Sequence, residues 1–175
     1  MSAPVWFDAK VYFNNKLAAL GGGYNDLTLT AAFKGAGYGT DADSLYRHFL
    51  DYGNAENVSP SAYFDAGYYM QAKAASYFHK AVNAVTPAEI SFVREAFARA
   101  GLSAWDHYLQ YGMAEGVDPN ANFDTSAYMD AKLAQMQASD PGYTMDMLVA
   151  AFKGAGLNPV THYLTYGRGE GLAIQ

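Results

Sequence analysis

Histidine, aspartate and glutamate recur at fixed places along this sequence, and together they could do chemistry. The block His-Tyr-Leu-Gln-Tyr-Gly begins at His107, Asp65 follows a phenylalanine upstream, and Glu115 stands three residues after the final glycine. Imidazole and carboxylate groups that meet in a fold can bind a divalent metal or act as general acid and base. Similar sets occur twice more, as Asp8, His48 and Glu56 and as Asp124, His162 and Glu170.

These residue types also have structural roles, and we prefer that interpretation. An aspartate before a helix caps its first turn, and a histidine near a helix end can bond a carbonyl or meet the negative end of the helix dipole. The glutamate can cap the next segment of the chain. An enzyme also rarely needs three equivalent sites in 175 residues. We therefore expect no catalytic residues and no enzyme, with a small-ligand or metal site at Asp65, His107 and Glu115 as the alternative.

Calcium is the metal that a second segment suggests. Oxygen-bearing side chains stand at alternate positions of segment 118–124, as in calcium-binding loops. However, Phe123 occupies the sixth position, where such loops have glycine, and Met129 occupies the twelfth, where they have a bidentate glutamate. We expect no bound cofactor, and calcium stays the alternative, with these candidate ligands: Asp118, Asn120, Asn122 and Asp124.

The elements that must position these residues come from an internal repeat. Phe-Asp pairs at 7, 64 and 123 are each followed by Ala-Phe-x-x-Ala-Gly and then by a histidine block. Pro60 and Pro119 mark the joins, so one helical domain, 1–175, divides into units 3–60, 61–119 and 120–175. The third unit shows no closing proline, which suggests the hypothesis that the sequence is a piece of a longer repeat-bearing protein.

Each unit is predicted to contain three helices. The aspartate of each Phe-Asp pair is a helix N-cap, and the preceding phenylalanine can act as a hydrophobic staple. Segment 86–89 is a capping box for a second helix that Gly101 ends, and a short third helix leads to Gly112. Strand alternation is not sustained anywhere. The predicted fold is therefore all-α, with three tandem three-helix repeats in a short solenoid or a single helical bundle.

Composition excludes several classes of protein. Apolar residues make up 51% of the chain and charged residues 16%, which excludes intrinsic disorder. The net charge of −6 argues against nucleic acid as a partner. No apolar run is long enough for insertion into a membrane, and no leader opens the chain. Cysteine is absent, so disulfides and thiolate metal sites are excluded.

Aromatic residues make up 15% of the chain, and most of them stand at the spacing of a helical core. Tyrosine and tryptophan outside that spacing could form platforms for sugars, because ring faces stack on the C–H faces of pyranoses while nearby polar groups bond the hydroxyls. Four aromatic residues fall outside the core pattern and are the candidates for surface binding: Trp6, Tyr24, Tyr38 and Tyr143.

The motif of the repeat resembles that of a known helical repeat. Phe64-Asp65 with Tyr69, then Ala-Gly, then the block from His107 to Glu115-Gly116 is similar to a helical repeat of large secreted bacterial surface proteins, of the adhesin, S-layer and haemolysin-type calcium-binding kind. The resemblance covers nearly the whole chain. The Asn-Pro-Asp-Val run usual after the first helix of such repeats is missing, and Asn57 replaces the glycine after Glu56.

The resemblance implies a non-enzymatic structural or adhesive module of a secreted protein at the bacterial cell surface. Its expected partners are envelope polysaccharide, through surface anchoring or S-layer-like assembly, or other copies of itself. The alternative is a small-ligand or divalent-metal binding module that uses the repeated Asp, His and Glu sets.

Overall fold

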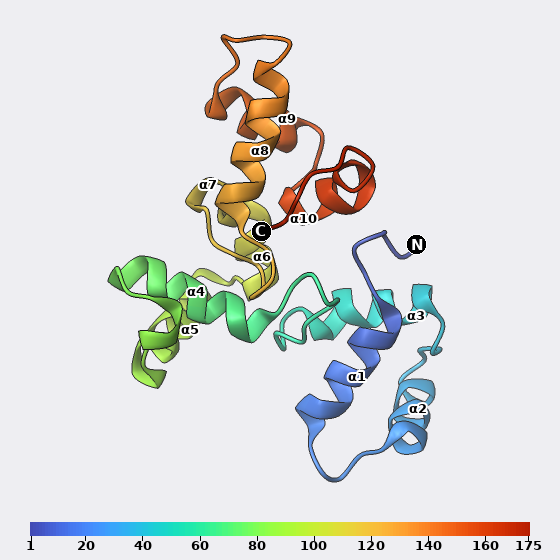
Figure 1. Cartoon of the computed structure of the whole chain (residues 1–175). Helices are drawn as coiled ribbons and strands as arrows, with labels where there is room; N and C mark the ends of the chain where they lie inside the picture. The colour runs from blue at the N-terminus through green and yellow to red at the C-terminus, as the bar shows by residue number, and fades with distance from the viewer.

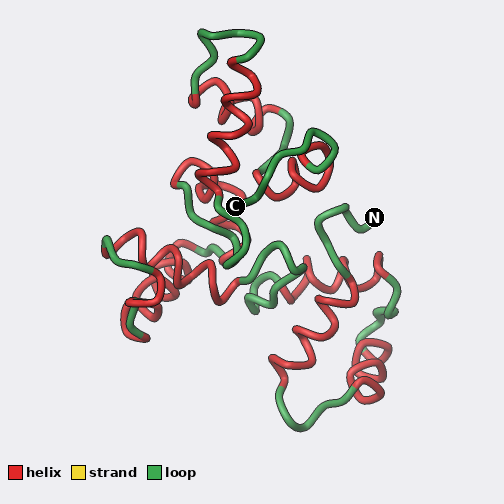
Figure 2. The backbone as a smooth tube through the Cα atoms, viewed as in Figure 1, coloured by secondary structure: helices red, strands yellow, loops and turns green.

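The regular secondary structure of the chain is entirely helical. The computed structural model describes all residues from 1 to 175, and it contains helices, turns and two isolated bridges, Ser61 with Phe64 and Asn120 with Phe123, but no strand. Figure 2 shows the same alternation of helices and loops along the backbone. The predicted all-α class is confirmed. No helix has the length and apolarity needed to cross a membrane.

Each predicted unit contains a helical hairpin followed by a shorter helical segment. The hairpins pair α1 with α2, α4 with α5 and α8 with α9, and a short 3-10 turn at Val82–Ala84 precedes α5. The α-helices have these bounds: α1 Ala9–Leu20, α2 Asp26–Gly35, α3 Ala42–His48, α4 Ala66–Phe78, α5 Pro87–Ala100, α6 Ala104–His107, α7 Met113–Glu115, α8 Thr125–Gln137, α9 Met145–Gly154 and α10 Pro159–His162.

The starts of the hairpins confirm the capping predictions. The carboxylates of Asp8, Asp65 and Asp124 accept backbone amide protons in the first turns of α1, α4 and α8. In each case the preceding phenylalanine packs on a tyrosine four residues after the cap, with ring centroids 5.3–5.4 Å apart. This contact is a hydrophobic staple. The Thr86–Glu89 capping box and the left-handed Gly101 are also present.

The third helix of each unit differs from the expected plain α-helix. After α3, α6 and α10 the backbone widens into a π-helical turn, at Phe49–Gly53, Tyr108–Gly112 and Tyr163–Gly167. Each turn ends on a glycine against which a tyrosine of the first helix lies. A Cβ at Gly112 would stand 2.9 Å from the Tyr69 hydroxyl, and one at Gly53 or Gly167 would collide with the equivalent hydroxyl. The wide turn and the absent side chain make room for the tyrosine.

Each unit closes on itself through the backbone. The amide of Asp8 donates to the carbonyl of Pro60 at 3.1 Å, and the amide of Asp65 donates to Pro119 at 2.9 Å. In the third unit the amide of Asp124 donates to Ile174 at 2.7 Å, so Ile174 stands where the other units have proline. The closing bond therefore does not require proline, because a carbonyl is its acceptor.

The three units meet near the middle of the molecule. Figure 1 shows the hairpins pointing outward in three directions, while α6 and α10 lie toward the centre. The Trp6 and Trp105 rings, from the first and second units, lie 4.4 Å apart between centroids. The fully buried Tyr108 accepts from the backbone amide of Val160 at 3.4 Å. Aromatic contacts thus join neighbouring units within the helical assembly that the repeats predict.

Candidate functional site

A buried tyrosine–histidine pair lies inside each unit. The hydroxyls of Tyr12, Tyr69 and Tyr128 lie 2.7, 2.8 and 2.6 Å from Nδ1 of His48, His107 and His162, in that order. The tyrosine comes from the first helix, four residues after the capping aspartate, and the histidine ends the third α-helix. These tyrosines have no exposed surface. The histidines therefore bond a phenol, not the carbonyl or helix end that the sequence led us to expect.

A lysine–glutamate pair accompanies each of these contacts. Lys16, Lys73 and Lys132 lie 2.5, 2.8 and 2.9 Å from the carboxylates of Glu56, Glu115 and Glu170. The expectation that the glutamates cap a following segment is therefore replaced by an ion pair across the unit. The lysines were missed from the sequence, although each stands eight residues after its capping aspartate. We call the tyrosine, histidine, lysine and glutamate of one unit its repeat cluster.

A phenylalanine from the second helix covers each histidine. The Phe97 and His107 rings stack at 4.3 Å with planes 17° apart, and Phe152 stacks on His162 at 4.5 Å and 18°. In the first unit Phe33 meets His48 edge-on at 4.7 Å. The histidine thereby links all three helices of its unit, since it contacts the first helix through tyrosine and the second through phenylalanine.

Burial sets the charge of these groups. Desolvation lowers the pKa of His48, His107 and His162, and the nearby lysine lowers it further, while the glutamate opposes the shift. Burial likewise raises the pKa of the three paired tyrosines. A neutral histidine next to a neutral phenol is suited to a hydrogen bond between helices, because neither group is poised to exchange a proton near neutral pH.

The histidine tautomer follows from the second unit. Nε2 of His107 lies 3.8 Å from Oε2 of Glu115, and the nearby carboxylate favours the tautomer that carries its proton on Nε2. Nδ1 is then the acceptor, and the Tyr69 hydroxyl donates to it. The Glu115 carboxylate near the ring is itself paired with Lys73.

The structure does not bring Asp65 to His107 and Glu115. Asp65 caps the start of α4, whereas Lys73, which pairs with Glu115, lies eight residues along the helix, about 12 Å away at the ordinary rise per residue. Nowhere do three His, Asp or Glu side chains gather closely enough to hold a metal ion. The copies at Asp8 and Asp124 cap helices in the same way.

The candidate calcium ligands form hydrogen bonds in the segment around Pro119, where the second unit meets the third. Oδ1 of Asp118 accepts from the Thr125 amide, and Oδ1 of Asp124 accepts from the Ala127 amide, both at 2.8 Å. Asn120 donates to the Tyr63 carbonyl and accepts from the amide of its neighbour Asn122, also at 2.8 Å. Burial raises the pKa of Asp118. The side-chain oxygens of Asp118, Asn120 and Asp124 therefore accept from backbone donors.

The four candidate surface aromatics divide among different environments. Tyr38 is buried and donates to Asp51 at 2.7 Å, a bond that raises the pKa of Tyr38 to about 12. Trp6 packs on Trp105, and Tyr143 is half-buried against the core. Only Tyr24 is exposed, at 43%. Position in a loop therefore did not predict exposure for three of the four.

Three further exposed tyrosines lie in the histidine blocks. Tyr52, Tyr111 and Tyr166, the residue before the glycine in each block, are 52, 47 and 53% exposed. Each lies beside the histidine of its unit, with ring centroids 5.2–5.6 Å apart. The sequence assigned these positions no role, and their recurrence in all three blocks is the signal that could have found them.

The second unit also carries a groove of about 440 Å³ between α4, α5 and the following π-helical turn. Its walls include the half-exposed rings of Tyr77, Phe92 and Tyr111, and Lys73 and Glu115 of the repeat cluster lie at its edge. His107 also contributes to the lining.

Comparisons with protein-family models, curated proteins and solved structures gave no match to this chain.

Proposed function

We propose that this chain is a non-enzymatic adhesive module of a secreted bacterial surface protein, and that it holds the protein to envelope polysaccharide through exposed aromatic side chains. The observation that carries the proposal is an arrangement of bonded polar groups beside an exposed tyrosine, which is repeated in every unit. The polar groups of the repeat cluster bond one another, while one tyrosine beside them is left half exposed at the same position.

A repeated set of equivalent aromatic rings suits a repetitive polymer. Tyrosine presents an apolar face for stacking on the C–H surface of a sugar and a hydroxyl for hydrogen bonding. One such contact is weak, but contacts that a single polymer chain makes at the same time reinforce one another, because each later contact forms at a high effective concentration. Tyr52, Tyr111 and Tyr166 provide one ring in each unit.

The metal-binding alternative has less support. The carboxylate and amide oxygens that the sequence offered for calcium, in Asp118, Asn120 and Asp124, accept from backbone amides. The repeated glutamates are paired with lysines, and a lysine ammonium competes with a cation for the same carboxylate.

The test is sedimentation of the whole chain with insoluble bacterial envelope polysaccharide. We expect the wild-type chain to sediment, and a variant with Y52A, Y111A and Y166A to bind at least ten-fold more weakly. Leu27, which is 81% exposed on α2, provides the matched control, and L27A is expected to bind as the wild type does. A wild-type chain that sediments with no envelope polysaccharide would overturn the proposal.

A further inference from the structure

The three units are not equivalent on their surfaces. Tyr77 on α4 and Phe92 on α5 face one another with ring centroids 5.4 Å apart and planes 35° apart, and they are 56 and 41% exposed. Tyr77 stands twelve residues after its capping aspartate, and the first unit has Leu20 at that position. Phe92 stands five residues before the phenylalanine that contacts the histidine, and the first unit has Thr28 there. The third unit has Met136 and Met147. Only the second unit has an aromatic wall here.

Polar groups stand at the edge of the same groove. Nζ of Lys73 lies 2.8 Å from Oε2 of Glu115, and Nε2 of His107 lies 3.8 Å from that oxygen. The Glu115 side chain keeps 34% of its surface exposed, so its carboxylate can still accept from a bound molecule. Lysine ammonium and histidine Nε2–H can donate. The groove therefore combines aromatic faces with both donors and acceptors.

We propose that this groove is a binding site for a neutral hexopyranose unit of a polysaccharide. The proposal deepens the adhesive function and rests on it. A pyranose has flat C–H faces bordered by hydroxyls, which matches ring faces bordered by an ion pair and an imidazole. The volume of the groove, about 440 Å³, falls within the range usual for small-molecule sites.

Charge favours a neutral sugar over an acidic one. The ammonium of Lys73 is already matched by the Glu115 carboxylate, so the groove offers no free cation to an anionic group. The chain as a whole carries a net charge of −6, which repels polyanions. Acidic polysaccharides are therefore expected to bind more weakly than neutral ones.

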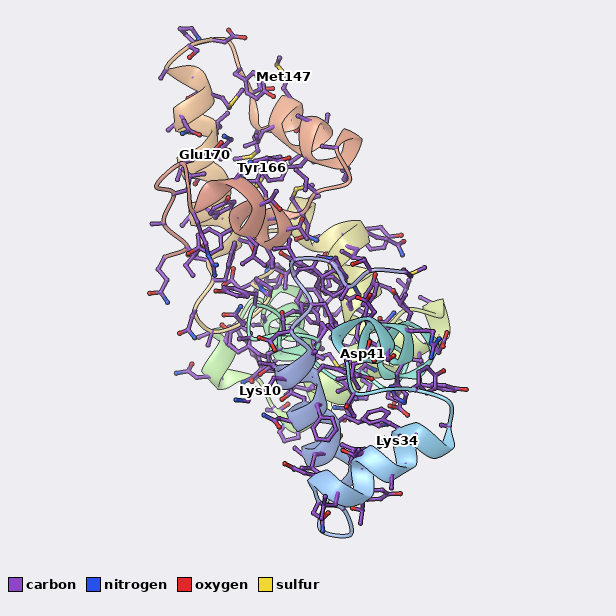
Figure 3. The ribbon with its side chains drawn as sticks, turned by 90° about the vertical axis from the view of Figure 1, so that its right-hand side faces the viewer. Lys10, Lys34, Asp41, Met147, Tyr166 and Glu170 are labelled. Atoms are coloured by element: carbon purple, nitrogen blue, oxygen red, sulfur yellow. The ribbon has the colours of Figure 1, made fainter.

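The third unit provides an internal control. Met147, 46% exposed, takes the place of Phe92, and Tyr166 and Glu170 of the same unit correspond to Tyr111 and Glu115. Figure 3 shows these three labelled side chains on the third unit. This unit keeps the ion pair and the exposed tyrosine but lacks the aromatic wall, so a substitution at Met147 changes an equivalent site without touching the proposed one.

The test is calorimetric titration of the whole chain with neutral tetrasaccharides of glucose, galactose, mannose and N-acetylglucosamine, and with a tetrasaccharide of galacturonic acid as the acidic probe. We expect at least one neutral probe to bind more tightly than the acidic one, with F92A and Y77A weakening it at least ten-fold and M147A less than two-fold. Unchanged thermal unfolding of F92A and Y77A would show that these exposed positions act on binding and not on folding.

Other outcomes overturn the inference in distinguishable ways. If the chain sediments with envelope polysaccharide but F92A and Y77A leave that binding intact, the adhesive function stands and this groove is not its site. Binding of none of the neutral probes, or tighter binding of the acidic probe, also overturns the site. If the wild-type chain forms a dimer and the F92A variant does not, a second copy of the chain occupies the groove, and the sugar site is overturned.

Discussion

At the scale of single residues, one hydrogen bond between a tyrosine and a histidine occurs in each unit. The pair is buried, and its histidine is held neutral by desolvation. Protonation would place a second donor on Nδ1 opposite the hydroxyl and would add a poorly solvated charge to the core. The pairs therefore tie the stability of the fold to pH.

We predict that stability falls as the pH drops below about 6.5, the ordinary pKa of histidine. Because the folded-state pKa of the three histidines is lowered, the unfolded chain binds more protons in this range. The contribution of these histidines to the free energy of unfolding is complete above the pKa of histidine in the unfolded chain. It is lost as the pH falls from that value toward the pKa of the histidines in the folded chain. The measurement is urea unfolding at pH 7.5 and 5.5, above the range where carboxyl groups ordinarily titrate.

The matched variants are H107L and H79N. Losing one of the three buried histidines should reduce the pH dependence by about one third, since three equivalent groups contribute to the linkage. His79 is exposed at the end of α4 in a left-handed conformation that asparagine tolerates, so H79N is the control for loss of a histidine outside the repeat clusters. Equal stability of the wild type at the two pH values would contradict the prediction.

At the scale of elements, the π-helical turn depends on its final glycine. In the second unit Gly112 lies under the Tyr69 hydroxyl and the Tyr108 ring, and a methyl group there has no free space. Gly154, at the end of α9, has open space around its Cα and ordinary backbone angles. The two glycines therefore have opposite expected responses to the same substitution.

We predict that G112A destabilises the chain by about 1–3 kcal/mol, the usual range for overpacking a filled core. The control G154A should be neutral or stabilising by up to about 1 kcal/mol, because alanine favours the helix and loses less backbone freedom on folding. Urea unfolding of both variants is the measurement. Equal effects at the two positions would mean that the tyrosine contact does not constrain the turn.

Much of the element structure could be predicted from the sequence, and the reason is local. Aspartate caps, phenylalanine staples, the Thr86–Glu89 box and the glycine stops act within a few residues, so spacing alone reveals them. The left-handed Asn57 keeps the conformation of the glycines it replaces, and its side chain also accepts from the Ala104 amide of the next unit at 2.8 Å.

The parts that could not be predicted depend on contacts between distant segments. Lys73 meets Glu115 and Tyr69 meets His107 only after the first and third helices pack, and helical spacing says nothing about that pairing. The π-helical turn makes room for the Tyr69 side chain, which comes from another helix. Tyr38 was predicted to lie on the surface because it is in a loop, yet it is buried and bonded to Asp51.

At the scale of the whole molecule, two tryptophans join the first and second units. Trp105 is 5% exposed, lies 4.4 Å from Trp6 and meets Phe64 at 4.9 Å. Nearby, Asn54 accepts from Ser103 at 2.6 Å and donates to Asp106 at 2.9 Å. These contacts place the start of α6 against the end of the first unit.

We predict that W105A destabilises the chain by about 3–5 kcal/mol, the usual effect of truncating a buried aromatic residue. The effect should appear as a loss of cooperativity between units in urea unfolding followed by several probes, because the remaining bonds lie mostly within units. The control is Y24A, whose side chain is 43% exposed and outside the core. A fully cooperative transition with less than about 1 kcal/mol of change would contradict this role, given the usual range for buried aromatics.

The central claim is that the recurrent histidines build the units through their tyrosines. A double-mutant cycle with Y69F, H107L and the double variant, measured by urea unfolding at pH 7.5, tests it most directly. Each single change leaves a buried polar partner unpaired, so the double variant should be less destabilised than the sum, with a coupling of about 0.5–3 kcal/mol. Additive effects within about 0.3 kcal/mol would contradict the account, because residues that bond one another do not behave independently.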